Sequence, residues 1–180
     1  MRMCSVAYFA ILLLVSPLLW SQTHDRDPLS DKEVDQLRET AMEPEKRLKL
    51  MVDFIRARLV ALEQARSDPK MAKDRGQHIH DLLEDLAGLV DEVDDNVENY
   101  NERSADLRKP LQQIVQIDSE LQTKLRELRA TVDDPKTANE ASDYKFALED
   151  ATESVNQSAE TSRKLLEEQS VKFAAAKKKK

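Results

Sequence analysis

Cysteine, glycine and aromatic residues are scarce in this chain of 180 residues. There is one cysteine, Cys4, there are two glycines, and only 4% of the residues are aromatic. Sheets and tight turns use glycine, β-branched and aromatic residues much more heavily, so a β-rich fold is disfavoured. Long helices need none of them, and 35% of the residues are charged. The composition therefore predicts an all-α fold that is more extended than a globule.

Residue types that carry catalysis or bind metals are also few. The only histidines are His24, His78 and His80. A di-iron bundle needs Glu three residues before His on two helices, but Arg75 and Gln77 stand three residues before His78 and His80. Neither a glycine-rich phosphate loop nor a Gly-x-Ser-x-Gly motif is present. We therefore predict no enzymatic activity, no cofactor, no metal and no small-molecule site.

Two histidines have acidic neighbours at helical spacing. His80 lies one turn from Glu84, and His78 lies one turn from Asp74 and Asp81. We interpret these groups as exposed ion pairs on a helix. The alternative is a metal site on the surface.

The N-terminal residues 1–21 have the layout of a secretory signal peptide. Arg2 precedes an apolar run, which ends at the helix-breaking Pro17 and the small Ser21. The run is short for a membrane span. Export to a periplasmic or extracellular compartment is therefore predicted, with cleavage after Ser21. Because Leu19 is large for a cleavage site, the alternative is an uncleaved N-terminal membrane anchor.

The stretch VDEVDDNVENYNE, residues 90–102, carries six carboxylates and no basic residue. An apolar heptad seam runs through it: Ile79, Leu83, Leu86, Val90, Val93, Val97 and Tyr100. A calcium loop starting at Asp94 would need glycine where Asn99 stands and glutamate where Ala105 stands. We therefore interpret the acidic residues as the solvated face of a helix.

Two Asp-Pro pairs mark connections between helices, since aspartate is a good N-cap and proline suits a first helical turn. The triplet DPK occurs at 68–70 and again at 134–136, and at the same offset Pro44 matches Pro110. We interpret the chain as two diverged helix–DPK–helix hairpins. Helices are expected to restart near 41 and near 107, which makes four helices. The alternative is three helices, with the central one kinked at Pro110.

One of these restarts has a further signal, because Thr40 and Glu43 form a capping-box pattern just before Pro44. If residues 41–66 fold back at Asp68-Pro69, residue i lies near residue 138 − i of the next helix. That register places Lys46, Arg47 and Lys49 beside the acidic residues Asp91, Glu92, Asp94 and Asp95.

The fold predicted is an elongated antiparallel helical bundle or coiled coil of three to four long helices. Residues 22–30 form a linker in which Ser30 caps the first helix, residues 31–173 form the bundle, and residues 174–180 form a basic tail. The last helix has a seam of small side chains that buries little area: Tyr144, Leu148, Ala151, Val155, Ser158, Ser162 and Leu165. We expect it to be the least stable helix.

Narrow apolar seams suit helix–helix association, either with a second copy or with an envelope protein. The alternatives are a four-helix-bundle carrier of a small ligand or metal, and a membrane-tethered spacer if residues 1–21 are retained. Cleavage removes Arg2 and no acidic residue, so the net charge goes from −7 to −8. Nucleic acid is therefore a poor partner. A contact with a membrane would involve the N-terminal segment or the lysines of residues 177–180.

The signal-peptide prediction can be checked by mass. Trp20 is the only tryptophan, so the exported protein should begin at Gln22 and should lack tryptophan fluorescence. Intact-mass spectrometry of protein recovered from its native compartment measures this. A mass that still includes Trp20 would show that the segment is retained as an anchor.

Overall fold

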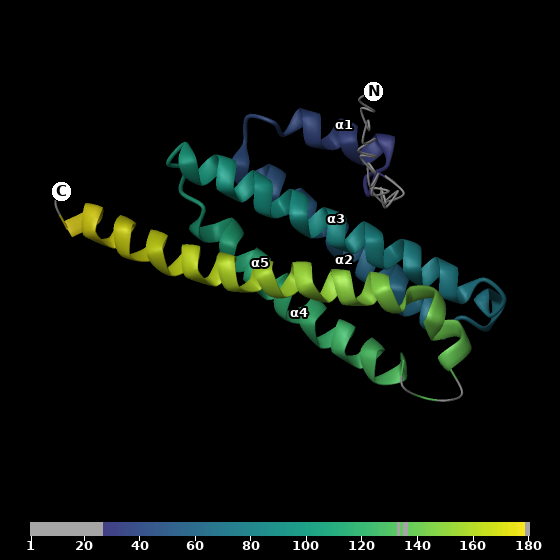
Figure 1. Ribbon diagram of the computed structural model, residues 1–180. Coiled ribbons are helices and arrows are strands. Elements are labelled where there is room, and N and C mark those ends of the chain that lie inside the picture. Colours follow the sequence, from purple (N-terminus) through teal and green to yellow (C-terminus); the bar gives the residue numbers. More distant parts are fainter. Residues whose placement is uncertain (1–26, 133, 135–136, 179–180) are drawn as a thin grey trace, which may run out of the picture.

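The computed structural model describes residues 27–132, 134 and 137–178, with side chains up to residue 175. In these ranges the chain forms five α-helices and one short 3₁₀ helix, and no strand. They are α1 (Asp31–Glu39), α2 (Pro44–Ser67), η1 (Pro69–Met71), α3 (Arg75–Glu102), α4 (Arg108–Val132) and α5 (Ala138–Lys178). The predicted all-α class is confirmed, and the helices pack against one another (Figure 1).

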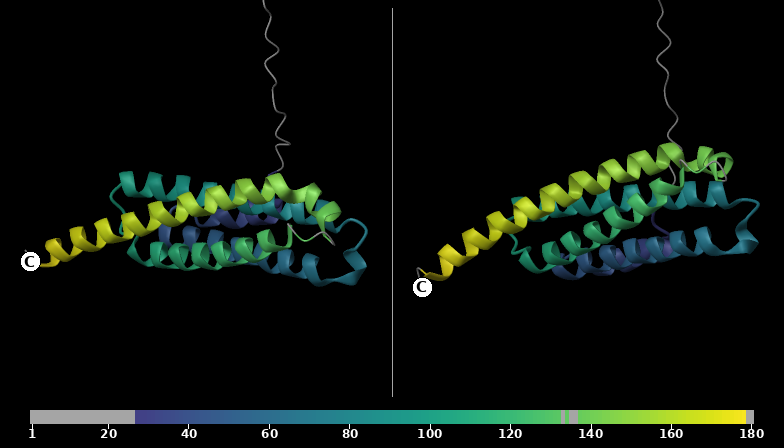
Figure 2. Two further views of the ribbon diagram at one scale, coloured as in Figure 1. Left: turned by 60° about the horizontal axis from the view of Figure 1, so that its bottom comes forward. Right: turned by 90° about the horizontal axis from the view of Figure 1, so that it is seen from below.

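The four longer helices lie side by side around a shared interior (Figures 1 and 2). α5 packs on both α3 and α4, and α2 packs on both α3 and α4. α3 and α5 run in the same direction, because Arg75 reaches Glu140 near one end and Gln169 reaches Asn101 near the other. α1 is a short helix that lies against α2.

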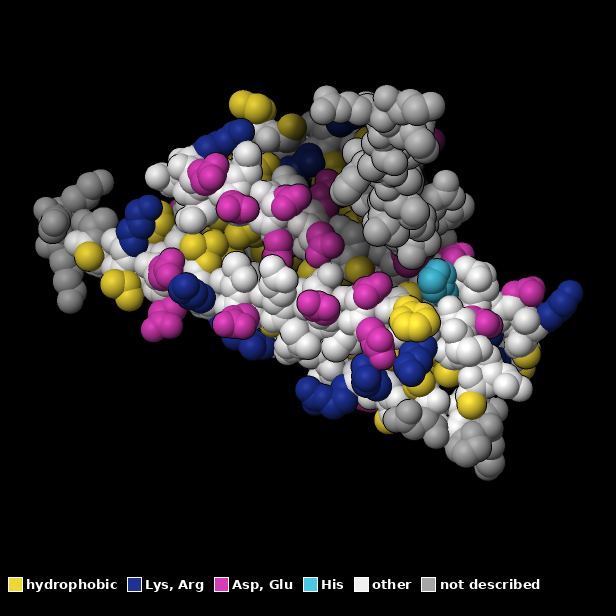
Figure 3. Space-filling view, in the orientation of Figure 1, with side chains coloured by type: hydrophobic (Ala, Val, Ile, Leu, Met, Phe, Trp, Pro, Cys, Tyr) yellow, Lys and Arg dark blue, Asp and Glu magenta, His cyan; other side chains and the backbone are white. Residues whose placement is uncertain are grey.

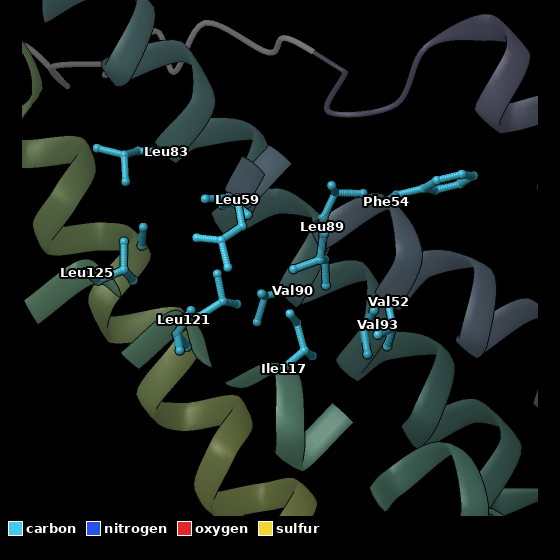
Figure 4. Packing of buried hydrophobic residues seen from close by; sticks show 14 of the residues in the cluster. Val52, Phe54, Leu59, Leu83, Leu89, Val90, Val93, Ile117, Leu121 and Leu125 are labelled. Carbon is cyan, nitrogen blue, oxygen red and sulfur yellow. The ribbon is translucent and has the colours of Figure 1, made fainter. Parts of the chain in front are cut away.

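The core is built from one apolar stripe on each long helix. Leu48, Leu83, Ile114 and Val155 come from four different helices and are almost fully buried. Side chains from α2, α3 and α4 meet in the middle of the bundle (Figure 4). The seam predicted through the acidic stretch belongs to this core, since Val90, Val93, Val97 and Tyr100 are all buried. Each aliphatic side chain buried in this way contributes about 1.5–3 kcal/mol.

The start of α1 is held by a charge cluster. The predicted capping box is present, because the Ser30 hydroxyl accepts from the Glu33 N–H and the Glu33 carboxylate accepts from the Ser30 N–H. Arg58 of α2 donates to Glu33 at 2.7 Å and to the Pro28 carbonyl at 2.8 Å. The Arg58 hydrogen bond lowers the pKa of Glu33 to about 2. Arg58 thus connects α1 to α2.

Two of the predicted helix starts are wrong. The Thr40 hydroxyl donates back to the Gln36 and Leu37 carbonyls and ends α1, while α2 begins at Pro44 without a side-chain cap. Asp68 does cap a helical turn, but that turn is η1, and α3 begins only at Arg75. In both places the chain uses the local hydrogen bonds for a turn before the next helix starts. Pro135, the corresponding proline before α5, lies outside the described residues.

α3 and α4 are separate helices, so the alternative of one kinked central helix is wrong. Ser104 has a φ of 60°, the left-handed conformation that commonly ends a helix. The Ala105 N–H then donates to the Tyr100 carbonyl at 3.0 Å. The side-chain amide of Gln169 on α5 holds this loop: it donates to the Ala105 carbonyl and accepts from the Leu107 N–H.

The predicted register between α2 and α3 is also wrong. Arg47 donates to Asn96 at 3.0 Å, and the Arg58 Nε lies 3.7 Å from an Asp85 oxygen. Their numbers add up to 143 in both pairs, not to 138, because the turn between the helices extends to residue 74. Lys46 pairs with Glu43 just before α2, and Lys49 pairs with Asp53 within α2, so neither lysine pairs with α3.

The two glycines of α3 provide a test of the packing between α3 and α5. A methyl group on Gly76 would lie 2.9 Å from the Glu140 backbone oxygen and against the Asp143 side chain. We expect Gly76→Ala to destabilise the protein by about 1–3 kcal/mol, despite the better helix propensity of alanine.

Gly88→Ala is the matched control, since the atoms nearest to the added methyl belong to the ring of Pro28, at 3.1 Å or more, and not to a backbone. It should change stability by less than about 1 kcal/mol. Urea unfolding followed by circular dichroism measures both variants. Equal effects at the two positions would contradict the close approach of α3 and α5 at Gly76.

Candidate functional site

Two carboxylates and a serine from three different helices meet inside the bundle. The Ser158 hydroxyl of α5 donates to Asp94 Oδ1 of α3 at 2.8 Å and lies 3.5 Å from Asp118 Oδ2 of α4. Asp118 is 1% exposed and Ser158 is 0% exposed, while Asp94 is half-buried. We call these three residues the carboxylate–serine cluster.

Small side chains on α5 bring these groups together. Ala151, Ser158 and Ala159 are completely buried on the face of α5 that packs on α3 and α4. Side chains of this size let the neighbouring helices approach closely. Asp94 and Asp118 are short, so only such an approach allows both carboxylates to reach the same hydroxyl.

Burial controls the charge of the cluster. Loss of hydration raises the pKa of Asp118 to about 7, with a further increase from the nearby Asp94 and smaller opposing effects of Ser158 and Arg163. Burial also raises the pKa of Asp94 to about 6, against the hydrogen bond from Ser158. Two carboxylates this close do not ionise independently. Because the pKa of Asp118 is about 7, the cluster can gain or lose a proton near neutral pH.

The hydrogen bonds also indicate that Asp118 carries a proton. A serine hydroxyl has one proton to donate, and Ser158 donates it to Asp94. Asp118 therefore has no proton from Ser158, and its own proton would point back to the Ser158 oxygen. One turn along α5, the hydroxyl of Ser162 is buried and has no hydrogen-bond partner in the described part of the chain. This region of the interior therefore contains polar groups that are not fully paired.

A groove between α3 and α5 lies outside the cluster. Its volume is about 420 Å³, and Asp94, Val97 and Leu165 are among the residues that line it. The space-filling view shows hydrophobic side chains in this groove with acidic side chains on both sides (Figure 3). Asp94 thus connects the cluster to the surface.

The acidic stretch is divided by this arrangement. Asp91, Asp95 and Glu98 are exposed, as expected for a solvated helix face. Asp94 departs from that interpretation, because its side chain turns to Ser158 and is partly buried. Seam periodicity alone did not separate Asp94 from its neighbours.

The histidine group on α3 has some of the geometry of a metal site. Ligand atoms of His80, Asp81 and Glu84 all lie within 4.8 Å of one another. The expected pair of His80 and Glu84 is present, with 3.3 Å between Nε2 and the carboxylate, and Gln77 donates to Asp81. All three ligands come from one helix and remain partly exposed. The prediction that no metal binds here stays untested.

Comparison with known proteins yields no match: no family model, no curated protein and no solved structure is significantly similar to this chain. Among the helices of the described residues, none has the length and apolar character needed to cross a membrane. Residues 1–21, where a signal peptide is predicted, lie outside the described residues.

Replacing Ser158 tests the hydrogen bond that joins α5 to α3. Ser158→Ala removes the only hydroxyl that reaches both carboxylates, so we expect a loss of about 1–3 kcal/mol at pH 7.5. Ser170→Ala is the control on the same helix, because Ser170 is exposed and bonds only to the Leu166 backbone carbonyl. It should cost less than about 0.5 kcal/mol. Urea unfolding compares the two variants, and similar losses would argue against a special role of Ser158.

Proposed function

We propose that this is an exported, non-enzymatic protein that acts through helix–helix association. The observation that carries the proposal is the C-terminal end of α5, which continues beyond the ends of the other helices (Figures 1 and 2). Gln169 contacts the loop between α3 and α4, and α5 then runs on to Lys178. We call residues 170–178 the α5 extension. At 1.5 Å per residue it reaches about 13 Å past Gln169.

The α5 extension offers apolar surface to a partner. Val171 is 66% exposed, and Phe173 is partly exposed under the guanidinium of Arg108, which lies 4.7 Å from the ring centre. Just before the extension, Leu165 and Leu166 are only partly covered by the core. Exposed apolar side chains on a projecting helix are the kind of surface through which helices associate. The simplest partner is the same α5 extension on a second copy, in an isologous pair.

For a small apolar ligand, the carrier alternative has less support from the surface. A small-ligand site is usually a concave pocket with mostly apolar walls. The hollow near Arg66 and Arg75 also has Glu63, Glu127 and Glu140 in its wall. The groove beside Asp94 is flanked by Asp95, Glu98 and Glu168. Such charged linings favour water and ions over an apolar ligand.

The domain organisation predicted from the sequence is part of the proposal. Pro44 is the first residue of α2 and Pro110 lies in the first turn of α4. Asp68 and Asp134 both lie in the connections that follow these helices. These matches support two diverged hairpins. Export rests on the signal-like residues 1–21, and retention of that segment would make the protein a tethered spacer.

Sedimentation tests the proposed association. We expect the average mass of the exported protein to rise with concentration, and Val171→Asp to lower the association constant by at least about tenfold. A charge in an apolar helix–helix contact costs more than about 1.4 kcal/mol because it loses its hydration. Circular dichroism should show an unchanged helix content.

Val60→Asp is the matched control, since Val60 is a valine that is 56% exposed on α2. It should leave the association unchanged. If both variants behave like the wild type, the α5 extension is not the interface. If the wild-type protein stays monomeric at all concentrations, self-association is wrong, and pull-down of the exported protein from its own envelope would then search for a different partner.

A further inference from the structure

We infer that the carboxylate–serine cluster is a proton-dependent lock that holds α5 on α3 and α4. With one proton on Asp118, a continuous chain of hydrogen bonds runs from Asp118 through Ser158 to Asp94. Without that proton, two negative charges face one hydroxyl group inside the bundle. The packing of α5 should therefore be tight when the proton is present and looser when it is absent.

The distances carry this inference. Ser158 Oγ is 2.8 Å from Asp94 and 3.5 Å from Asp118, so the hydroxyl satisfies the first carboxylate and leaves the second in need of a donor. Asp118 is 1% exposed, which leaves little room for water to serve that need. A buried carboxyl group in this position is stabilised by carrying its own proton.

The charged groups around the cluster do not replace the proton. On α3, Asp91 and Asp95 add negative potential at Asp94. On α5, Arg163 attracts Asp118, but its hydrogen bonds go to Ser119 and Gln122. Lys164 lines the outer groove beside Asp94.

From α2, the side chains that face the interior near α4 are apolar. α2 and α4 are linked at Glu45–Lys109 and at Glu63–Lys124. Between these links the buried residues of α2 are Leu48, Met51, Val52, Phe54, Ile55, Leu59 and Leu62. They can neither donate a hydrogen bond nor neutralise a carboxylate.

The lock matters because, around Ser158, α5 buries mostly small side chains against α3 and α4. Among the neighbouring inner residues, Ala151, Ala159 and Ser162 bury small areas, and Val155 is the larger apolar side chain within one turn of Ser158. Gln169 holds the far end of α5 through the loop between α3 and α4. A change of charge on Asp94 or Asp118 therefore acts on the middle of α5, beside Ser158.

The direction of the pH effect follows from the pKa values. Both folded values, about 7 for Asp118 and about 6 for Asp94, lie above the ordinary aspartate value of 3.8. The folded state therefore holds more protons than the unfolded state between about pH 4 and pH 7. The stability that the cluster contributes is complete below that range and is lost as the pH rises through it. Glu33, with a pKa of about 2, has the opposite effect, but only below about pH 4.5.

The experiment compares Asp118→Asn with Asp95→Asn in the exported chain. Asparagine keeps the shape of the protonated acid and its ability to donate. We expect Asp118→Asn to raise the folding equilibrium constant about tenfold or more at pH 8, and less than about twofold at pH 4.5. Urea unfolding at both pH values measures this. The exposed Asp95→Asn variant removes only one of the smaller influences that raise the pKa of Asp94, so it should keep most of the pH dependence of the wild type.

Hydrogen exchange locates the effect. At a single pH of 8, backbone amides of residues 151–165 should exchange more slowly in Asp118→Asn than in the wild type, while those of α1 keep their rates. Carbon-13 NMR titration should place the side-chain carboxyls of Asp94 and Asp118 well above pH 4. A wild-type pH dependence that persists in Asp118→Asn, carboxyls that titrate near pH 4, or a slowing spread evenly over all helices would overturn the inference. Because the lock works within one chain, these outcomes do not depend on whether two chains associate.

Discussion

The close approach of α5 to α3 and α4 is the contact on which the other features of this protein depend. It is made possible by small inner side chains, with Ala151, Ser158 and Ala159 completely buried. The same feature limits how much apolar area the contact can bury. Polar groups then fall inside the bundle, and their hydrogen bonds become part of what holds the helix in place. Ser158 near the middle and Gln169 near the end both join α5 to two other parts of the chain.

α5 thereby combines two properties. Its inner face carries Ser158, which lies beside the buried carboxyl group of Asp118 on α4. Its far end projects from the bundle and exposes Val171. In the proposed function the projecting end meets a partner, and the inner face sets how firmly the helix is attached to the rest of the protein. The two properties lie on one continuous helix, with the contacts of Gln169 between them.

Local signals were read correctly from the sequence where one residue type has one strong preference. Ser30 and Glu33 form the expected capping box, because serine and glutamate at this spacing satisfy each other's backbone N–H groups. The same kind of signal failed at Thr40, whose hydroxyl found nearer acceptors in the preceding helix. At Asp68 the cap formed, but on a 3₁₀ turn. Capping patterns indicate that a helical turn begins or ends, and the tertiary packing decides how long that turn continues.

Asp118 and Ser158 of the candidate site are polar residues at seam positions, and heptad periodicity alone does not say whether such residues are buried. Asp118 interrupts the apolar seam of its helix, and Ser158 and Ser162 stand within the seam of theirs. All three are buried. A polar residue in a seam can lie in a loop, as Ser104 does, or lie buried in the bundle, as Asp118 does. The difference depends on which helix lies opposite, and that information is not local.

Composition and heptad spacing by themselves determined that this chain is helical and which stripe of each helix is apolar, because both depend on neighbours within two turns. The tertiary structure decided the register and the fate of individual charges. Asp94 and Asp95 are adjacent and chemically identical, yet Asp94 bonds to Ser158 and Asp95 faces water. Successive residues on a helix point about 100° apart, so the position of α5 against α3 selects one carboxylate for the interior and leaves the other in solvent.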